Sequence, residues 1–127
     1  GGIFAITAEP LMPTPLMAII IGGIGGALVF FGTELLTKLK IDDVVGAIPV
    51  HLIAGVWGTL AVPITNPDTS FGTQFLGTAS ICVFVFVVSI IIWALMKATI
   101  GIRISEEAEK EGTDVAETGV IAYSIRD

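Results

Sequence analysis

The sequence predicts an all-α integral membrane protein with three transmembrane helices and a short cytoplasmic tail. Of its 127 residues, 54% are hydrophobic, and the mean hydropathy of +0.92 is too high for a water-soluble globule of this size. A helix needs roughly 20 apolar residues to cross about 30 Å of hydrocarbon. The uncharged stretches near that length are Leu16–Thr33, Val44–Ile64 and Thr69–Met96. The corresponding helices are expected at about residues 15–37, 44–64 and 73–100. Three buried helices of a soluble protein are the alternative, but so short a chain has nothing with which to bury them all.

The first residues, Gly1–Ala8, are apolar but too few to span a membrane. They contain neither an initiating Met nor a Lys or Arg, so they do not read as a signal peptide. Glu9 and three prolines within the next six residues then interrupt any helix. This pattern predicts the last turns of a helix that began upstream, in a C-terminal fragment of a longer membrane protein.

The first full helix carries the glycine-rich segment IGGIGGA, in which Gly22 and Gly26 are four residues apart. Such spacing of small residues lets a second transmembrane helix approach closely. The alternative is glycine merely tolerated in a lipid-facing helix. The density of glycine favours tight packing of this helix.

The basic residues predict the orientation of the chain. Lys38 and Lys40 lie between the first and second helices, and Lys97 and Arg103 follow the third, whereas the second connection holds Asp68 and no basic residue. Lys and Arg are enriched in cytoplasmic loops. We therefore expect the first connection and the C-terminus to face the cytoplasm, and the turn-rich connection TNPDTSFG to face outward.

Composition also excludes several classes of function. One cysteine, Cys82, offers neither a disulfide nor a thiol pair for a metal. A single histidine without a Ser/His/Asp set argues against an enzyme, and no cofactor or metal is expected. The formal net charge of −6 argues against a nucleic-acid partner.

After Gly101 the composition becomes acidic: residues 105–127 hold seven acidic residues against Lys110 and Arg126. In the segment ISEEAEKEG, Ser105 is expected to cap a short helix whose first turn holds carboxylates and which ends at Gly112. A solvated tail with no fixed structure is the alternative.

The only histidine, His51, stands within the second helix, the least polar place for it. It lies eight residues after Asp43, or roughly 12 Å into the membrane at about 1.5 Å per residue. A titratable group at that depth is a candidate functional site. On the same face of the helix we expect Ala47, Gly55 and Gly58. Their small or absent side chains predict a shallow strip of surface beside the imidazole. Two interpretations of His51 remain open. It makes a hydrogen bond to another helix, or it lies on a pathway for a proton or small cation.

The segment DDVVGAIPVHLIAGVWGTLAV closely resembles a signature of the Amt/Mep/Rh ammonium transporters, in the Amt branch. GGIFAITAEP resembles the end of that family's eighth helix, KLKIDD the linker before its tenth, and GIRISEEAEKEGTDVAETGVIAY its cytoplasmic tail. The resemblance covers the whole chain as roughly the last third of an Amt protein. It implies ammonium or ammonia as the substrate of a multi-pass protein of the cell (inner) membrane, embedded in the lipid bilayer.

The resemblance implies an eleven-helix fold in which the three helices here are the ninth to the eleventh. It implies a homotrimer with a hydrophobic, histidine-lined pore in each protomer. His51 matches one of two pore histidines, the other belonging to a helix outside this chain, and Ala47 would line the pore wall. Residues 1–100 would be part of the transmembrane region, and residues 101–127 the regulatory tail.

In that family the tail couples the subunits and meets PII-type signal proteins. The residues that fit its GxRxSEExExxGxD pattern are Arg103, Glu106, Glu107, Gly112 and Asp114. Ala116 replaces a threonine that plant members phosphorylate, so that switch is expected to be missing. The alternative function is a structural membrane subunit or an ammonium sensor, in which His51 only makes an interhelical hydrogen bond.

Overall fold

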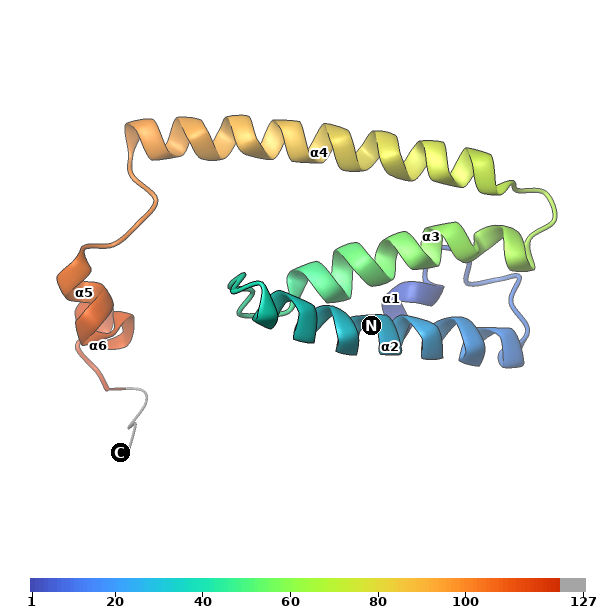
Figure 1. The fold of residues 1–127 in the computed structure, drawn as a ribbon, viewed down its shortest axis with the longest axis horizontal. Helices are drawn as coiled ribbons and strands as arrows, with labels where there is room; N and C mark the ends of the chain where they lie inside the picture. Colours follow the sequence, from blue (N-terminus) through green and yellow to red (C-terminus); the bar gives the residue numbers. More distant parts are fainter. Residues whose placement is uncertain (122–127) are drawn as a thin grey trace. The chain divides into compact units, whose positions relative to one another are not determined.

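The computed structural model describes residues 1–121 of the chain, so the end of the tail motif, Ala122 and Tyr123, lies outside the described residues. The described part is helical and contains no strand. In order, its elements are α1 (Gly2–Ile6), α2 (Pro15–Lys38), the π-helical segment η1 (Ile48–Ile53), α3 (Ala54–Thr65), α4 (Phe71–Thr99), α5 (Glu106–Glu111) and α6 (Thr113–Thr118) (Figure 1). The chain divides into two compact units, and the boundary between them in the sequence falls within α4, after Phe84.

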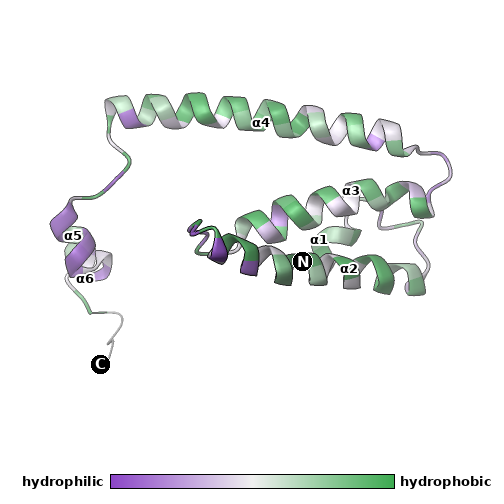
Figure 2. Cartoon of the chain, viewed as in Figure 1, coloured by the Kyte–Doolittle hydropathy of each residue, from purple (hydrophilic) through white to green (hydrophobic). Residues whose placement is uncertain are grey.

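Three helical stretches are long and apolar enough to cross a membrane: Pro15–Lys38, Ile48–Thr65 and Phe71–Thr99. Figure 2 shows α2, α3 and α4 as mainly hydrophobic and α5 as mainly hydrophilic. The prediction of an all-α protein with three membrane-spanning helices is confirmed. The second helix begins at Ile48 rather than at residue 44 as predicted, because Val44 and Val45 form a turn and Gly46 follows at a φ of +68°.

Within residues 1–84, α1 packs against both α2 and α3, and α2 packs against η1 and α3 (Figure 1). The centre of this packing is a cluster of Ala5, Ile21 and Ala61, with Trp57 partly buried against it. The indole Nε1 of Trp57 donates a hydrogen bond to the Ile21 carbonyl at 3.0 Å, which ties α3 to α2.

Glycine makes these close approaches possible. A Cβ added at Gly25 of α2 would lie 2.5 Å from the Cβ of Ala5, and one added at Gly58 of α3 would lie 2.9 Å from the Cα of Ala5. Real Cβ atoms are essentially never found so close to backbone. Ala5 is therefore wedged between two glycines, and α1 fits only because both lack side chains.

The packed stripe of α2 differs from the predicted pair of Gly22 and Gly26. A Cβ at Gly26 would meet nothing within 4 Å, whereas one at Gly22 would meet Gly2, and one at Gly32 would meet Pro49 and Ile53. One face of α2 carries Gly22, Gly25 and Gly32, because three residues make nearly one helical turn and seven residues nearly two. Tight packing of α2 through glycine is thus observed, but Gly25 and Gly32 replace Gly26 as its contact points.

The helix α4 has no buried residue. Its apolar side chains are exposed along its whole length, as expected for a helix whose surroundings are lipid or other protein.

Candidate functional site

The candidate pore histidine lies in a π-helical segment and not in the regular α-helix that the sequence predicts. His51 is the fourth residue of η1, and the N–H at its C-terminal end, that of Ala54, bonds to the carbonyls of Pro49 and His51. The bond to Pro49 spans five residues, which defines a π turn. Such turns are rare and occur frequently at functional sites. The sequence signal for an irregular turn was Pro49, which has no N–H to give to a regular α-helical ladder.

An aspartate anchors the start of this segment. The Asp43 carboxylate accepts hydrogen bonds from two backbone N–H groups, Oδ1 from Ala47 and Oδ2 from Ile48, each at 2.8 Å. Both donors lie at the N-terminal end of a helix, where N–H groups lack intrahelical partners and negative charge is favoured. Asp43 therefore acts as a two-pronged cap on the helix that carries His51.

Close packing fixes the same segment from the side. Pro49 is fully buried. A Cβ added at Gly32 of α2 would lie 3.1 Å from Pro49 Cβ and 2.9 Å from Ile53 Cδ1, so both side chains rest directly on the α2 backbone. Pro49 and Ile53 flank His51 in sequence, and their contacts hold the turn against α2.

The imidazole of His51 points away from that contact and is exposed. Its ring meets the ring of Phe4 in an edge-to-face arrangement, with centroids 4.4 Å apart and planes at 70°. Among residues 1–121 the imidazole makes this ring contact but no hydrogen bond. Both ring nitrogens are thus open to a partner or a substrate outside the described part of the chain.

The neighbours of His51 differ in part from those predicted. Gly55 and Thr59 share its side of the helix, whereas Gly58 faces Ala5 of α1. The wider π turn shifts the helical phase after His51, so a residue seven positions on no longer lies above it. Ala47 stands at the entrance of the segment with its N–H bonded to Asp43, and it does not line the groove beside His51.

A groove of about 310 Å³ lies beside His51. It is lined by His51, Leu52, Gly55, Val56 and Thr59 of the second span and by Gln74, Gly77, Thr78, Ile81 and Cys82 of α4. The Thr78 hydroxyl in its wall is buried without a hydrogen-bond partner in the structure. Within residues 1–121 no three His, Cys, Asp or Glu side chains come together as metal ligands.

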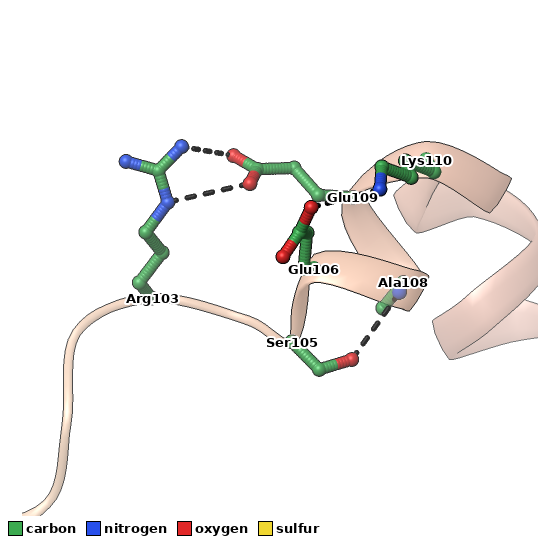
Figure 3. Close-up of polar contacts among 6 residues, drawn as sticks. All are labelled: Arg103, Ser105, Glu106, Ala108, Glu109 and Lys110. Atoms are coloured by element: carbon green, nitrogen blue, oxygen red, sulfur yellow. Dashed lines mark hydrogen bonds and ion pairs between the residues drawn. The ribbon is translucent and has the colours of Figure 1, made fainter.

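The tail has its own set of polar contacts (Figure 3). Arg103 binds Glu109 through two hydrogen bonds, from Nη2 at 2.6 Å and from Nε at 3.3 Å. These bonds, and then the charge of Glu109, raise the pKa of Arg103. Lys110 pairs with Glu106 at 2.8 Å. Glu109, the residue that Arg103 binds, belongs to the tail pattern but was not among the residues singled out from it.

The predicted start and end of the tail helix are confirmed. The Ser105 hydroxyl accepts a hydrogen bond from the Ala108 N–H at 3.2 Å, and α5 ends at Gly112, whose φ is +103°. A Cβ at Gly112 would meet only the end of the flexible Asp114 side chain, so it is the positive φ that favours glycine there. Glu107 is exposed in the first turn of α5.

Comparison with known proteins identifies the chain's relatives. The sequence model described as Ammonium Transporter Family matches residues 1–123. The chain is 35% identical to the ammonium transporter Amt2 of Archaeoglobus fulgidus, over 97% of this chain and 31% of the relative. It is 36% identical to the ammonium transporter of Bacillus subtilis, over 97% of this chain and 34% of the relative. It is 34% identical to the ammonium transporter Amt1 of Haloferax mediterranei, over 97% of this chain and 25% of the relative.

The chain spans about a quarter to a third of the length of these curated relatives. The matched family consists of transporters and not of enzymes. Together with the three apolar spans, the match over nearly the whole chain shows a multi-pass membrane protein, and this chain belongs to the ammonium transporter family.

Proposed function

We propose that His51 lines the path of ammonium or ammonia through a transporter to which this chain contributes three membrane helices. The observation that carries the proposal is the placement of His51. Its side chain is exposed in the first turn of an apolar span, in a π-helical segment, and makes no hydrogen bond within residues 1–121. An ionisable group in a membrane-spanning segment is costly against lipid and is expected to face protein, a cavity or water.

The chemistry of a neutral imidazole suits this substrate. A neutral imidazole offers one hydrogen-bond donor and one acceptor. Ammonium is costly in hydrocarbon, whereas ammonia with a proton relayed separately along imidazoles avoids that cost. Potassium cannot give up a proton or donate a hydrogen bond. Discrimination between these cations therefore rests on chemistry more than on diameter.

Several further features belong to the same proposal. The C-terminus faces the cytoplasm, as the placement of Lys38, Lys40, Lys97 and Arg103 favours. The working protein is a homotrimer in the cell membrane and serves nitrogen uptake. Ala47 contributes to the wall of the pathway near its cytoplasmic end.

The tail is proposed to regulate transport and to meet a PII-type signal protein. The residues given to this role are Arg103, Glu106, Glu107, Gly112 and Asp114. The short helices α5 and α6, joined at Gly112, support this role because the first turn of α5 presents three exposed carboxylates, those of Glu106, Glu107 and Glu109.

The test is ammonium uptake, with potassium as competitor, in cells that lack their own ammonium transporters. The full-length transporter that contains this chain is compared with its His51→Ala and Val50→Ala variants at equal amounts in the membrane. Val50 precedes His51 in the same π turn and controls for truncation there. Altered rate or ion selectivity in His51→Ala alone supports the proposal. Equal rate and selectivity in all three proteins assigns His51 to interhelical packing, which is the structural-subunit alternative. A parent that moves no ammonium favours a sensor.

A further inference from the structure

The hydrogen bonds at the entrance of η1 form a complete set. Helix entrances leave N–H groups without intrahelical partners, and such groups are costly to bury unpaired. Here the N–H groups of Ala47 and Ile48 bind Asp43, Pro49 has none, and the Val50 N–H donates to the Gly46 carbonyl at 3.0 Å. The Asp43 carboxylate therefore accepts hydrogen bonds from both backbone N–H groups that have no backbone acceptor.

The backbone between Asp43 and His51 is held at several points. Gly46, at a φ of +68°, turns the chain so that the carboxylate lies under the first N–H groups of the helix. Pro49 then packs on Gly32 of α2, and His51 follows two residues later. Charge-assisted hydrogen bonds are roughly twice as strong as neutral ones, so the two bonds that Asp43 accepts add to the packing of Pro49 in holding this turn.

We propose that Asp43 is a positioning residue for His51, holding the π turn whose geometry sets the direction of the imidazole. This inference rests on the proposed function of His51. The first turn already contains one bond of ordinary α-helical spacing, from the Val50 N–H to the Gly46 carbonyl. Without the two bonds that Asp43 accepts, the N–H groups of Ala47 and Ile48 lose their partners and this entrance is free to fray, which releases the start of the segment that carries His51.

The chain offers a matched control in the neighbouring residue. Asp42 carries the same charge on the same loop, but its side chain has no hydrogen bond or ion pair within residues 1–121. Asp43→Leu removes both acceptors at similar size, and Asp43→Asn leaves one acceptor oxygen. Asp42→Asn removes an equal charge without touching the turn.

The experiment uses the full-length transporter with three readouts: the amount of folded protein in the membrane, the maximal rate and KM of ammonium uptake, and the ¹⁵N resonances of the His51 ring. Those resonances are identified by their loss in His51→Ala. Asp43→Leu is expected to lower the maximal uptake rate per folded transporter by about tenfold or more, because a small misplacement of a functional group can cost up to about a hundredfold. It should also shift the His51 ring resonances. Asp43→Asn should fall between Asp43→Leu and the parent, and Asp42→Asn should match the parent.

Two results overturn the proposal. One is an Asp43→Leu protein whose folded fraction alone falls, with uptake per folded transporter and the His51 resonances unchanged. The other is an equal effect of Asp42→Asn, which would make the loop charge, and not the cap, responsible. If His51→Ala leaves transport unaltered, the proposed function fails separately. The ring resonances then still decide whether Asp43 sets the position of the imidazole.

Discussion

Substitution of Gly58 by Ala tests whether α1 is wedged between α2 and α3. The new Cβ would lie 2.8 Å from the carbonyl carbon of Ala5 and 2.9 Å from its Cα, so backbone and not a flexible side chain would have to move. Inserting a methyl group into a packed core costs about 1–3 kcal/mol. Replacing a helical glycine by alanine stabilises the helix by about 1 kcal/mol, which offsets part of this cost.

Gly55 supplies the control, because a Cβ there meets nothing within 4 Å in the same helix. The helix-propensity gain is common to both variants and cancels in their difference. Gly58→Ala should therefore be less stable than Gly55→Ala by about 1–3 kcal/mol. Stability is measured on the purified chain by denaturant titration, following the fluorescence of Trp57 in a Trp93→Phe background. Equal unfolding midpoints for the two variants would refute the wedge.

Three further predictions follow from the same contacts. Gly25→Ala should lower the free energy of unfolding by about 1–3 kcal/mol relative to Gly26→Ala in the same titration, because only the first meets Ala5. Trp57→Phe should lower the free energy of unfolding by about 1 kcal/mol through loss of its indole hydrogen bond, and an unchanged midpoint in a titration followed by circular dichroism would show that bond to be dispensable. Ser105→Ala should reduce the helix content of a peptide of residues 101–121 in circular dichroism, whereas a peptide with unchanged helicity would mean that its cap contributes nothing.

The membrane spans were predictable because hydrocarbon thickness fixes how many apolar residues a helix needs. The Ser105 cap was predictable for a similar reason, since a serine followed by carboxylates is a local signal. Close approach through glycine was also foreseen for α2. The sequence could not tell which glycines make contact. Gly25 and Gly26 differ only in the direction each faces, and the contact depends on where α1 lies.

The candidate site could be proposed from its residue, but its geometry could not be predicted. His51 stood out as the only histidine in an apolar span, whereas the π turn depends jointly on Pro49, the Asp43 cap and packing on Gly32. Each of these is ordinary alone, and only the fold brings them together. The Arg103–Glu109 pair was missed for a related reason: the two residues are six apart and meet only because the chain bends before α5.

The central claim, that His51 faces the conducted substrate, is tested most directly with a thiol at its position. His51→Cys is made in a full-length transporter otherwise free of cysteine, with Cys82→Ser included, and exposed to silver ion, a small cation that binds thiols. If the claim holds, silver blocks ammonium uptake by His51→Cys but not by the cysteine-free parent, and excess ammonium slows the block. Uptake that continues unchanged in the presence of silver would contradict it, because residue 51 would then lie outside the pathway.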